Sequence, residues 1–204
     1  MKQDVVASLR AAVVALLAFT ILCGIGYPLL VLGLGQAMFP HQANGSLVAD
    51  HGRVVGSELI GQPFTHPGYF WSRPSAVGPV PYNAMTSSGT NAGPTDGHGK
   101  PNPALHDAVA ARIAALRAAD PGNTAPVPVD LVTASASGLD PHISPAAAYY
   151  QAARVARVRG LPLGEVRALV ETHTEGRTFG LLGEPRVEVV ALNRALDART
   201  GPPR

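Results

Sequence analysis

Close to its N-terminus, the chain has a long apolar stretch that no charged residue interrupts. Residues 11–35 contain no Asp, Glu, Lys or Arg, and about 20 apolar residues are enough for a helix to cross the hydrocarbon core of a bilayer. Inside lipid, the backbone polar groups of a segment must pair within that segment. The pattern therefore predicts a transmembrane helix over residues 11–35, preceded by a short N-terminal segment, residues 1–10.

The basic residues near this stretch predict its orientation. Lys2 and Arg10 precede it, and the next Lys or Arg is Arg53. Because basic residues favour the cytoplasmic side, we expect residues 1–10 in the cytoplasm and residues 36–204 as an extracytoplasmic (periplasmic) soluble domain. The predicted protein is single-pass and lies in the cell inner membrane.

The length and the residues of the stretch indicate whether it is cleaved and whether it contacts other helices. Its apolar part is longer than the roughly 7–15 residues of a cleavable signal, which favours a retained anchor, although Gly35 and Ala37 leave open a small-residue cleavage site. Pro28 predicts a kink or a helix contact, because proline removes one helical hydrogen bond. Glycines leave flat surface where partner helices can approach; they are Gly24, Gly26, Gly33 and Gly35.

After the anchor, paired apolar residues alternate with turn residues. Apolar pairs occur at 47–48, 54–55 and 59–60, and an Asp-His-Gly sequence at 50–52 separates the first two. This pattern predicts a short β-hairpin. The helical and strand periods are then lost over residues 62–101, which are rich in Pro, Gly, Ser and Asn. Because long irregular loops are usually functional, we expect this one to face a partner.

Helical signals return after residue 101. Asn102 with Pro103, and Ser144 with Pro145, have the cap-plus-proline form of a helix start. The patterns predict helices at 103–119, 146–159, about 163–173 and about 186–198, and a strand at 127–133. The predicted fold class is α+β, with a small sheet covered by helices behind one transmembrane helix.

Composition narrows the function classes. Hydrophobic residues make up 46% of the 204 residues, and the net charge is only +2. This charge does not favour nucleic-acid binding. Cys23 is the only cysteine and lies in the predicted span, and the seven histidines are scattered without an HExxH pair. We therefore expect no metal site.

One loop gathers residue types that nucleophilic catalysis needs. Ser135, Ser137, Asp140 and His142 lie within eight residues, so a membrane-tethered envelope hydrolase using Ser137 and His142 is the alternative function. No GxSxG elbow surrounds either serine. Asp140 and Ser144 are more simply explained as turn-forming and helix-capping residues, and we expect no catalytic residues.

A glycine-rich turn is the candidate for anion binding. The sequence SSGTNAGP, at residues 87–94, offers backbone N–H groups near Ser87, Gly89, Asn91 and Gly93. A solvated turn explains it equally well. A nucleotide-binding module is a third function class, but the nearby Gly and Lys residues at 97–100 do not satisfy the Walker pattern, because prolines replace two of its required residues.

Basic residues concentrate in the second half of the chain. Arg154 and Arg157 are three positions apart on a predicted helix and share a face. The two alternatives are a solvated basic face and a contact with a negatively charged partner.

Four motifs carry a resemblance to a known family. They are VVGSELIGQPF (54–64), YFWSRPSA (69–76), PVDLVTASASGLDPHISPAAA (128–148) and TEGRTFGLLGEPRVEVVALNRALD (174–197). In this order, behind one N-terminal span, the chain resembles the C subunit of the potassium-transporting P-type ATPase. The family usually has SGGSNLGP where this chain has SSGTNAGP, which puts site residues in that turn in doubt.

The resemblance implies a non-catalytic subunit that assembles and stabilises an ATP-driven potassium uptake complex. Its implied partners are a channel-like potassium-binding subunit, an ATP-hydrolysing subunit and membrane lipid, with no nucleic acid. It also implies a catalytic chaperone that raises the ATP affinity of the hydrolysing subunit. The resemblance thus implies that ATP is bound through the hydrolysing subunit, and we expect no cofactor bound stably by this chain.

Overall fold

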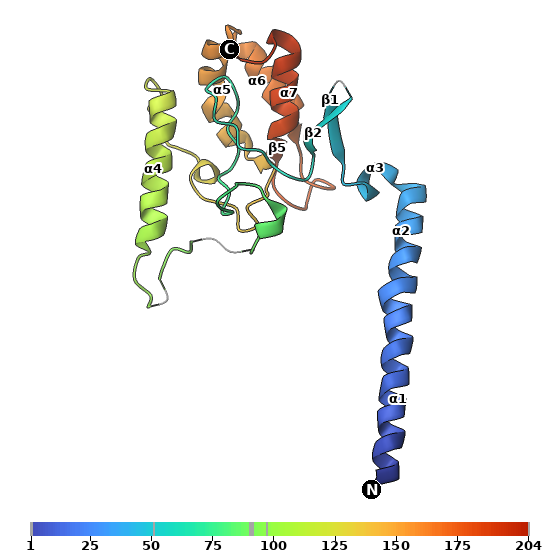
Figure 1. Ribbon diagram of the computed structural model, residues 1–204. Coiled ribbons are helices and arrows are strands. Elements are labelled where there is room, and N and C mark those ends of the chain that lie inside the picture. The colour runs from blue at the N-terminus through green and yellow to red at the C-terminus, as the bar shows by residue number, and fades with distance from the viewer. Residues whose placement is uncertain (1, 51, 90–91, 97, 204) are drawn as a thin grey trace. The chain divides into compact units, whose positions relative to one another are not determined.

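The computed structural model describes residues 2–50, 52–89, 92–96 and 98–203. It divides into two compact units, Met1–Leu47 and Val48–Arg204. Both the apolar N-terminal helix and the α+β domain expected from the sequence are confirmed (Figure 1).

The N-terminal unit is almost entirely helical. It consists of α1 (Lys2–Ile21), a π-helical turn (Leu22–Gly26), α2 (Tyr27–Met38) and the short α3 (Pro40–Ala43). By length and composition, Val5–Met38 is a helix capable of crossing a membrane. It includes the predicted segment 11–35 and extends beyond it at both ends, because residues 5–10 and 36–38 continue the same helix.

The π-helical turn lies directly before Pro28. The Tyr27 N–H donates to the Leu22 carbonyl, five residues back. Proline has no N–H and its ring crowds the carbonyl four residues earlier, and a π turn is one of the local adjustments that absorb such a defect. The irregularity lies where Pro28 predicts it, and the structure shows its form.

The residues that follow α3 form two small sheets. β1 (Leu47–Asp50) and β2 (Arg53–Ser57) pair as the predicted hairpin; His51, in the predicted turn, lies outside the described residues. β3 (His142–Ile143), β4 (Thr174–Glu175) and β5 (Arg186–Glu188) form an antiparallel sheet in the order β3-β5-β4. These short strands bring segments far apart in the sequence into contact.

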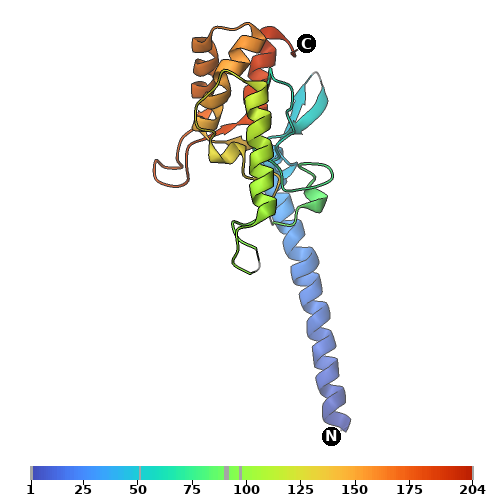
Figure 2. The same cartoon turned by 90° about the vertical axis from the view of Figure 1, so that its left-hand side faces the viewer.

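The helices of the domain begin and end close to where their caps predict. They are α4 (Pro103–Ala119), α5 (Pro145–Arg159), α6 (Leu163–Thr172) and α7 (Val189–Thr200). At the start of α5, the Ser144 side chain accepts a hydrogen bond from the Ala147 N–H, and at its end Gly160 adopts the left-handed conformation. The core is buried mainly among α5, α6, α7 and β5. In contrast, α4 stands at the edge of the domain (Figures 1 and 2).

One predicted element was wrong, and one predicted helix begins later than expected. Residues 127–133 form a 3-10 turn (Val129–Leu131) instead of a strand, because Asp130 turns inward and accepts hydrogen bonds from the Ser144 N–H and hydroxyl. Residues 186–188 form β5 instead of the start of a helix. Glu188 then caps α7, accepting from the Val190 N–H at 3.0 Å.

The long segment 62–101 is largely irregular, as predicted, but its first part contributes a side chain to the core. Phe70 is fully buried in the core. The Asn193 side chain accepts from the Phe70 N–H and donates to the Phe70 carbonyl, both at 2.9 Å. The backbone at Phe70 is therefore held inside the domain, where a side-chain amide satisfies both its N–H and its carbonyl.

Candidate functional site

The two ends of the predicted anion-binding turn contact different parts of the domain. The Ser87 hydroxyl donates to the Ser137 carbonyl at 2.7 Å, and Gly89 is an exposed residue with a positive φ of 69°. The Gly93 carbonyl accepts from the Asn102 side chain at 3.0 Å. Asn91 lies outside the described residues. Of the described candidates, Gly93 lines a cavity whose lining does not include Ser87 or Gly89.

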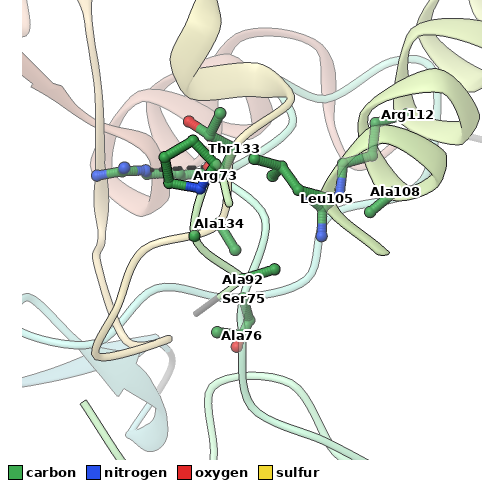
Figure 3. A pocket seen from close by; sticks show the side chains of 11 residues that line it. Arg73, Ser75, Ala76, Ala92, Leu105, Ala108, Arg112, Thr133 and Ala134 are labelled. Atoms are coloured by element: carbon green, nitrogen blue, oxygen red, sulfur yellow. Dashed lines mark hydrogen bonds between the residues drawn. The ribbon is translucent and has the colours of Figure 1, made fainter. Parts of the chain in front are cut away.

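This cavity lies between α4 and the body of the domain (Figure 3). Its volume is about 530 Å³, within the range of small-ligand pockets. Small and apolar residues make up most of the lining, together with two guanidinium groups, and the full lining is Arg73, Ser75, Ala76, Ala92, Gly93, Pro94, Leu105, Ala108, Arg112, Thr133 and Ala134. Among the described residues, neither an aspartate nor a glutamate lines it.

The two arginines of this cavity have different partners. Arg73 donates to the Thr133 carbonyl at 3.3 Å and pairs with Asp140 at 3.1 Å. Arg112 donates to the Val132 carbonyl at 2.7 Å, and burial lowers its pKa. Within the described part of the chain, no carboxylate forms a salt bridge with Arg112. A half-buried cation of this kind can hold an anion.

Asp140 forms hydrogen bonds with Arg73 and with the backbone of its own loop. Burial by itself raises the pKa of its carboxyl, but hydrogen bonds from His142 and Arg73 outweigh burial, and the net pKa is lowered. Its carboxylate accepts from the His142 N–H at 3.0 Å. Asp140 therefore acts as the turn-forming residue that the simpler interpretation expected.

The alternative hydrolase site does not assemble. The Ser137 hydroxyl lies 3.1 Å from the Ser135 hydroxyl and accepts from the Leu139 N–H. His142 Nδ1 lies 3.7 Å from a carboxylate oxygen of Asp140. Among the described residues, no hydrogen bond joins Ser137 to His142, so the serine lacks the base that a triad requires.

Metal-ligating side chains are equally dispersed. Within residues 2–50, 52–89, 92–96 and 98–203, no three His, Cys, Asp or Glu side chains gather in a group that could hold a metal ion.

The arginine cluster is not the surface face that the sequence suggested. Arg154 is only 1% exposed. It donates to the Pro67 and Tyr69 carbonyls and to the Gln151 side chain, and its guanidinium stacks 4.8 Å from the centre of the Trp71 ring. Burial lowers its pKa to about 10. A solvated basic face and a contact with a negatively charged partner are therefore both wrong for Arg154, because the N–H groups of its guanidinium donate to backbone carbonyls inside the domain.

The neighbouring arginines also serve the fold. Arg157 pairs with the buried Asp120 at 2.8 Å, and Arg159 pairs with Asp197 at 2.8 Å. Arg159 also stacks on the Tyr69 ring. Sequence reasoning missed this network. The YFWSR motif was a partial signal, since the Tyr69 and Trp71 rings are suited to stacking with cations, but it does not specify which arginines they meet.

Together, the apolar helix and the α+β domain fit the class of single-pass membrane proteins. The chain belongs to the KdpC family, described as the c chain of the K+-transporting ATPase, whose sequence profile matches residues 9–198. This chain is an accessory subunit and not the catalytic one.

Curated relatives agree with this family. The chain is 64% identical over 189 residues to the potassium-transporting ATPase KdpC subunit of Methylococcus capsulatus, covering 93% of this chain and 96% of the relative. It is 65% identical to the protein of the same description from Polaromonas naphthalenivorans (93% and 94% covered) and 63% identical to that from Sorangium cellulosum (94% and 97% covered).

Proposed function

We propose that this chain stabilises a potassium-uptake ATPase complex and acts as its catalytic chaperone. Its N-terminal helix packs against the channel-like potassium-binding subunit, and its domain covers the extracytoplasmic face of that subunit. The observation that carries the proposal is the family match across both units, from the apolar helix to α7. The implied partners are that subunit and the ATP-hydrolysing subunit.

The anchor offers a surface suited to helix packing. Gly33 lies on α2 with open space around the position where a side chain would project. Such positions let a second helix approach closely. We expect Gly33→Leu to leave the isolated chain intact and to reduce recovery of partner subunits. Leu32→Phe is the matched control, because it enlarges a side chain that already occupies its position.

The proposed orientation places residues 1–10 in the cytoplasm, the span at 11–35 and residues 36–204 outside. In a Cys23→Ala background, we expect Met85→Cys to react with a membrane-impermeant maleimide on intact cells. Ser8→Cys should react only after permeabilisation. The reverse pattern would place the domain in the cytoplasm and overturn the orientation.

An effect on ATP affinity then has to cross the membrane. Because ATP and the domain lie on opposite sides in this proposal, the chain acts by favouring one conformational state of the pump over another. The test is potassium-stimulated ATP hydrolysis by the complex, titrated against ATP, with and without this chain. We expect its loss to raise the apparent KM for ATP while the other subunits stay associated. An unchanged KM in an intact complex contradicts the chaperone role.

Direct nucleotide binding is the competing explanation. It would use the turn containing Ser87, Gly89, Asn91 and Gly93, with Arg112 as the nearby cation. Saturable binding of ATP to the purified full-length chain, weakened by Arg112→Gln, would favour that explanation. We expect no saturable binding, since the described part of the turn directs the Ser87 hydroxyl to the Ser137 carbonyl.

A further inference from the structure

The loop between β4 and β5 carries three exposed apolar side chains at its tip. Phe179 is 90% exposed, Leu181 78% and Leu182 64%. Figure 2 shows this loop projecting from the domain. Transfer of apolar surface out of water is favourable, so three such side chains within four residues form a surface suited to contact. We call residues 178–182 the apolar tip.

Hydrogen bonds within the loop hold the apolar tip in one conformation. The Thr178 N–H donates to the Leu182 carbonyl at 2.9 Å, and the Leu182 N–H donates back to the Thr178 carbonyl at 3.0 Å. At the base of the loop, one Arg177 nitrogen donates to both carboxylate oxygens of Glu184, at 3.0 and 2.8 Å. These bonds fix the shape in which the three side chains are presented.

The backbone at the apolar tip is strained where its largest side chain projects. Phe179 has a φ of 55°, in the left-handed region that disfavours side chains. The glycines at 180 and 183 also have positive φ, which glycine tolerates. Strained residues persist where function requires their geometry. The isolated domain gains no buried contact from Phe179 in return for this strain, since that side chain is almost fully exposed.

The charges at the base of the loop help to distinguish a lipid surface from a protein as the contact of the apolar tip. Arg177 pairs with Glu184, and Arg186 pairs with Glu175 at 2.9 Å. Two cations and two anions balance, so the loop lacks the excess of basic residues that favours an anionic lipid surface. A fixed, strained shape also gives no advantage in fluid lipid, whereas it lowers the entropy cost of entering a rigid pocket.

We propose that the apolar tip inserts into an apolar pocket of a partner protein in the same complex, with the paired charges of the loop base at the rim. This inference rests on the proposed function, since it assumes that the chain assembles with other subunits. Its form is that of an interface hot spot, in which a few central apolar side chains are surrounded by polar groups.

The first test measures assembly. Full-length chain with Phe179→Gly and Leu181→Ser is co-expressed with the other subunits of the complex and purified through a tag. We expect roughly a tenfold loss of co-purified partner after detergent washing, as for truncation of interface anchors. Met85→Ala is the matched control, because Met85 is also exposed and apolar but lies in another segment. Unchanged recovery with the double variant overturns the inference.

The single variant Phe179→Gly separates contact from folding. Because glycine tolerates a positive φ, it should leave the thermal stability of the chain unchanged or raise it while partner recovery falls. A fall in both stability and recovery would assign Phe179 a structural role and count against the inference. If wild-type chain itself recovers no partner, the proposed function fails; if wild-type chain and variants recover partner equally, this inference alone fails.

The second test identifies the occupant. A photo-crosslinking residue, p-benzoylphenylalanine, replaces Phe179 in the full complex, which is then irradiated in the membrane. We expect an adduct with another subunit of the complex. An adduct only with lipid, or only with a second copy of this chain, overturns the proposed occupant.

Discussion

Gln151 pairs with Trp71 as a neighbouring strand would. The side-chain oxygen of Gln151 accepts from the Trp71 N–H at 2.8 Å, and its side-chain nitrogen donates to the Trp71 carbonyl at 3.2 Å. Asn193 makes the same pair of bonds with Phe70. An extended segment thus has its backbone satisfied inside the domain by side chains from two helices, α5 and α7.

Loss of the Gln151 amide should destabilise the domain. Gln151→Leu leaves the N–H and carbonyl of Trp71 without these partners and removes one acceptor from Arg154, so we expect a loss of about 3 kcal/mol. Trp71 is the only tryptophan in the chain, and its fluorescence in detergent-solubilised protein reports unfolding of the domain. Gln151→Glu, which keeps the acceptor, should lose less; equal losses would contradict this account.

Arg154 should not tolerate lysine. Arg154→Lys keeps the charge but cannot reach the Pro67 and Tyr69 carbonyls, the Gln151 side chain and the Trp71 ring together. We expect a loss of about 2 kcal/mol in urea unfolding followed by Trp71 fluorescence. Arg167→Lys, at an exposed position, is the control and should change the free energy of unfolding by less than about 0.5 kcal/mol.

Gly61 should be required for a close approach of chain segments. A β-carbon there would lie 2.5 Å from the Tyr82 ring and 2.7 Å from the Asp140 carbonyl. We expect Gly61→Ala to cost about 2 kcal/mol, since the backbone atom cannot move away freely. In Gly164→Ala, on α6, the new methyl group meets no atom within 4 Å. That variant should be neutral or slightly stabilising in the same unfolding measurement.

Asp140 should make the domain acid-sensitive. Its pKa in the folded state is below its ordinary value. The stabilisation it gives is therefore fully present above the ordinary carboxyl pKa of about 3.9, and is lost as the pH falls through the lower folded-state pKa. We expect the stability of Asp140→Asn to change less than that of the wild-type chain as the pH is lowered through this range, measured by urea unfolding at each pH. An equally steep acid dependence in the variant would assign the effect to other carboxyls.

Elements with local signals could be predicted from the order of residues alone. The apolar stretch requires a helix because lipid offers no hydrogen-bond partners. Asn102 and Ser144 place helix starts because caps act on neighbouring backbone groups. The family motifs were likewise visible as a string of residues.

The roles of the residues within those motifs depend on long-range packing. Arg154 reads as a surface cation, but it is buried because carbonyls more than 80 residues earlier in the chain turn toward it. Residues 127–133 read as a strand, but Asp130 bends inward to hold Ser144. Ser137 and His142 are close in sequence, yet each has a different partner. Such hydrogen bonds form only once distant segments have come together, and local periodicity does not specify which segments meet.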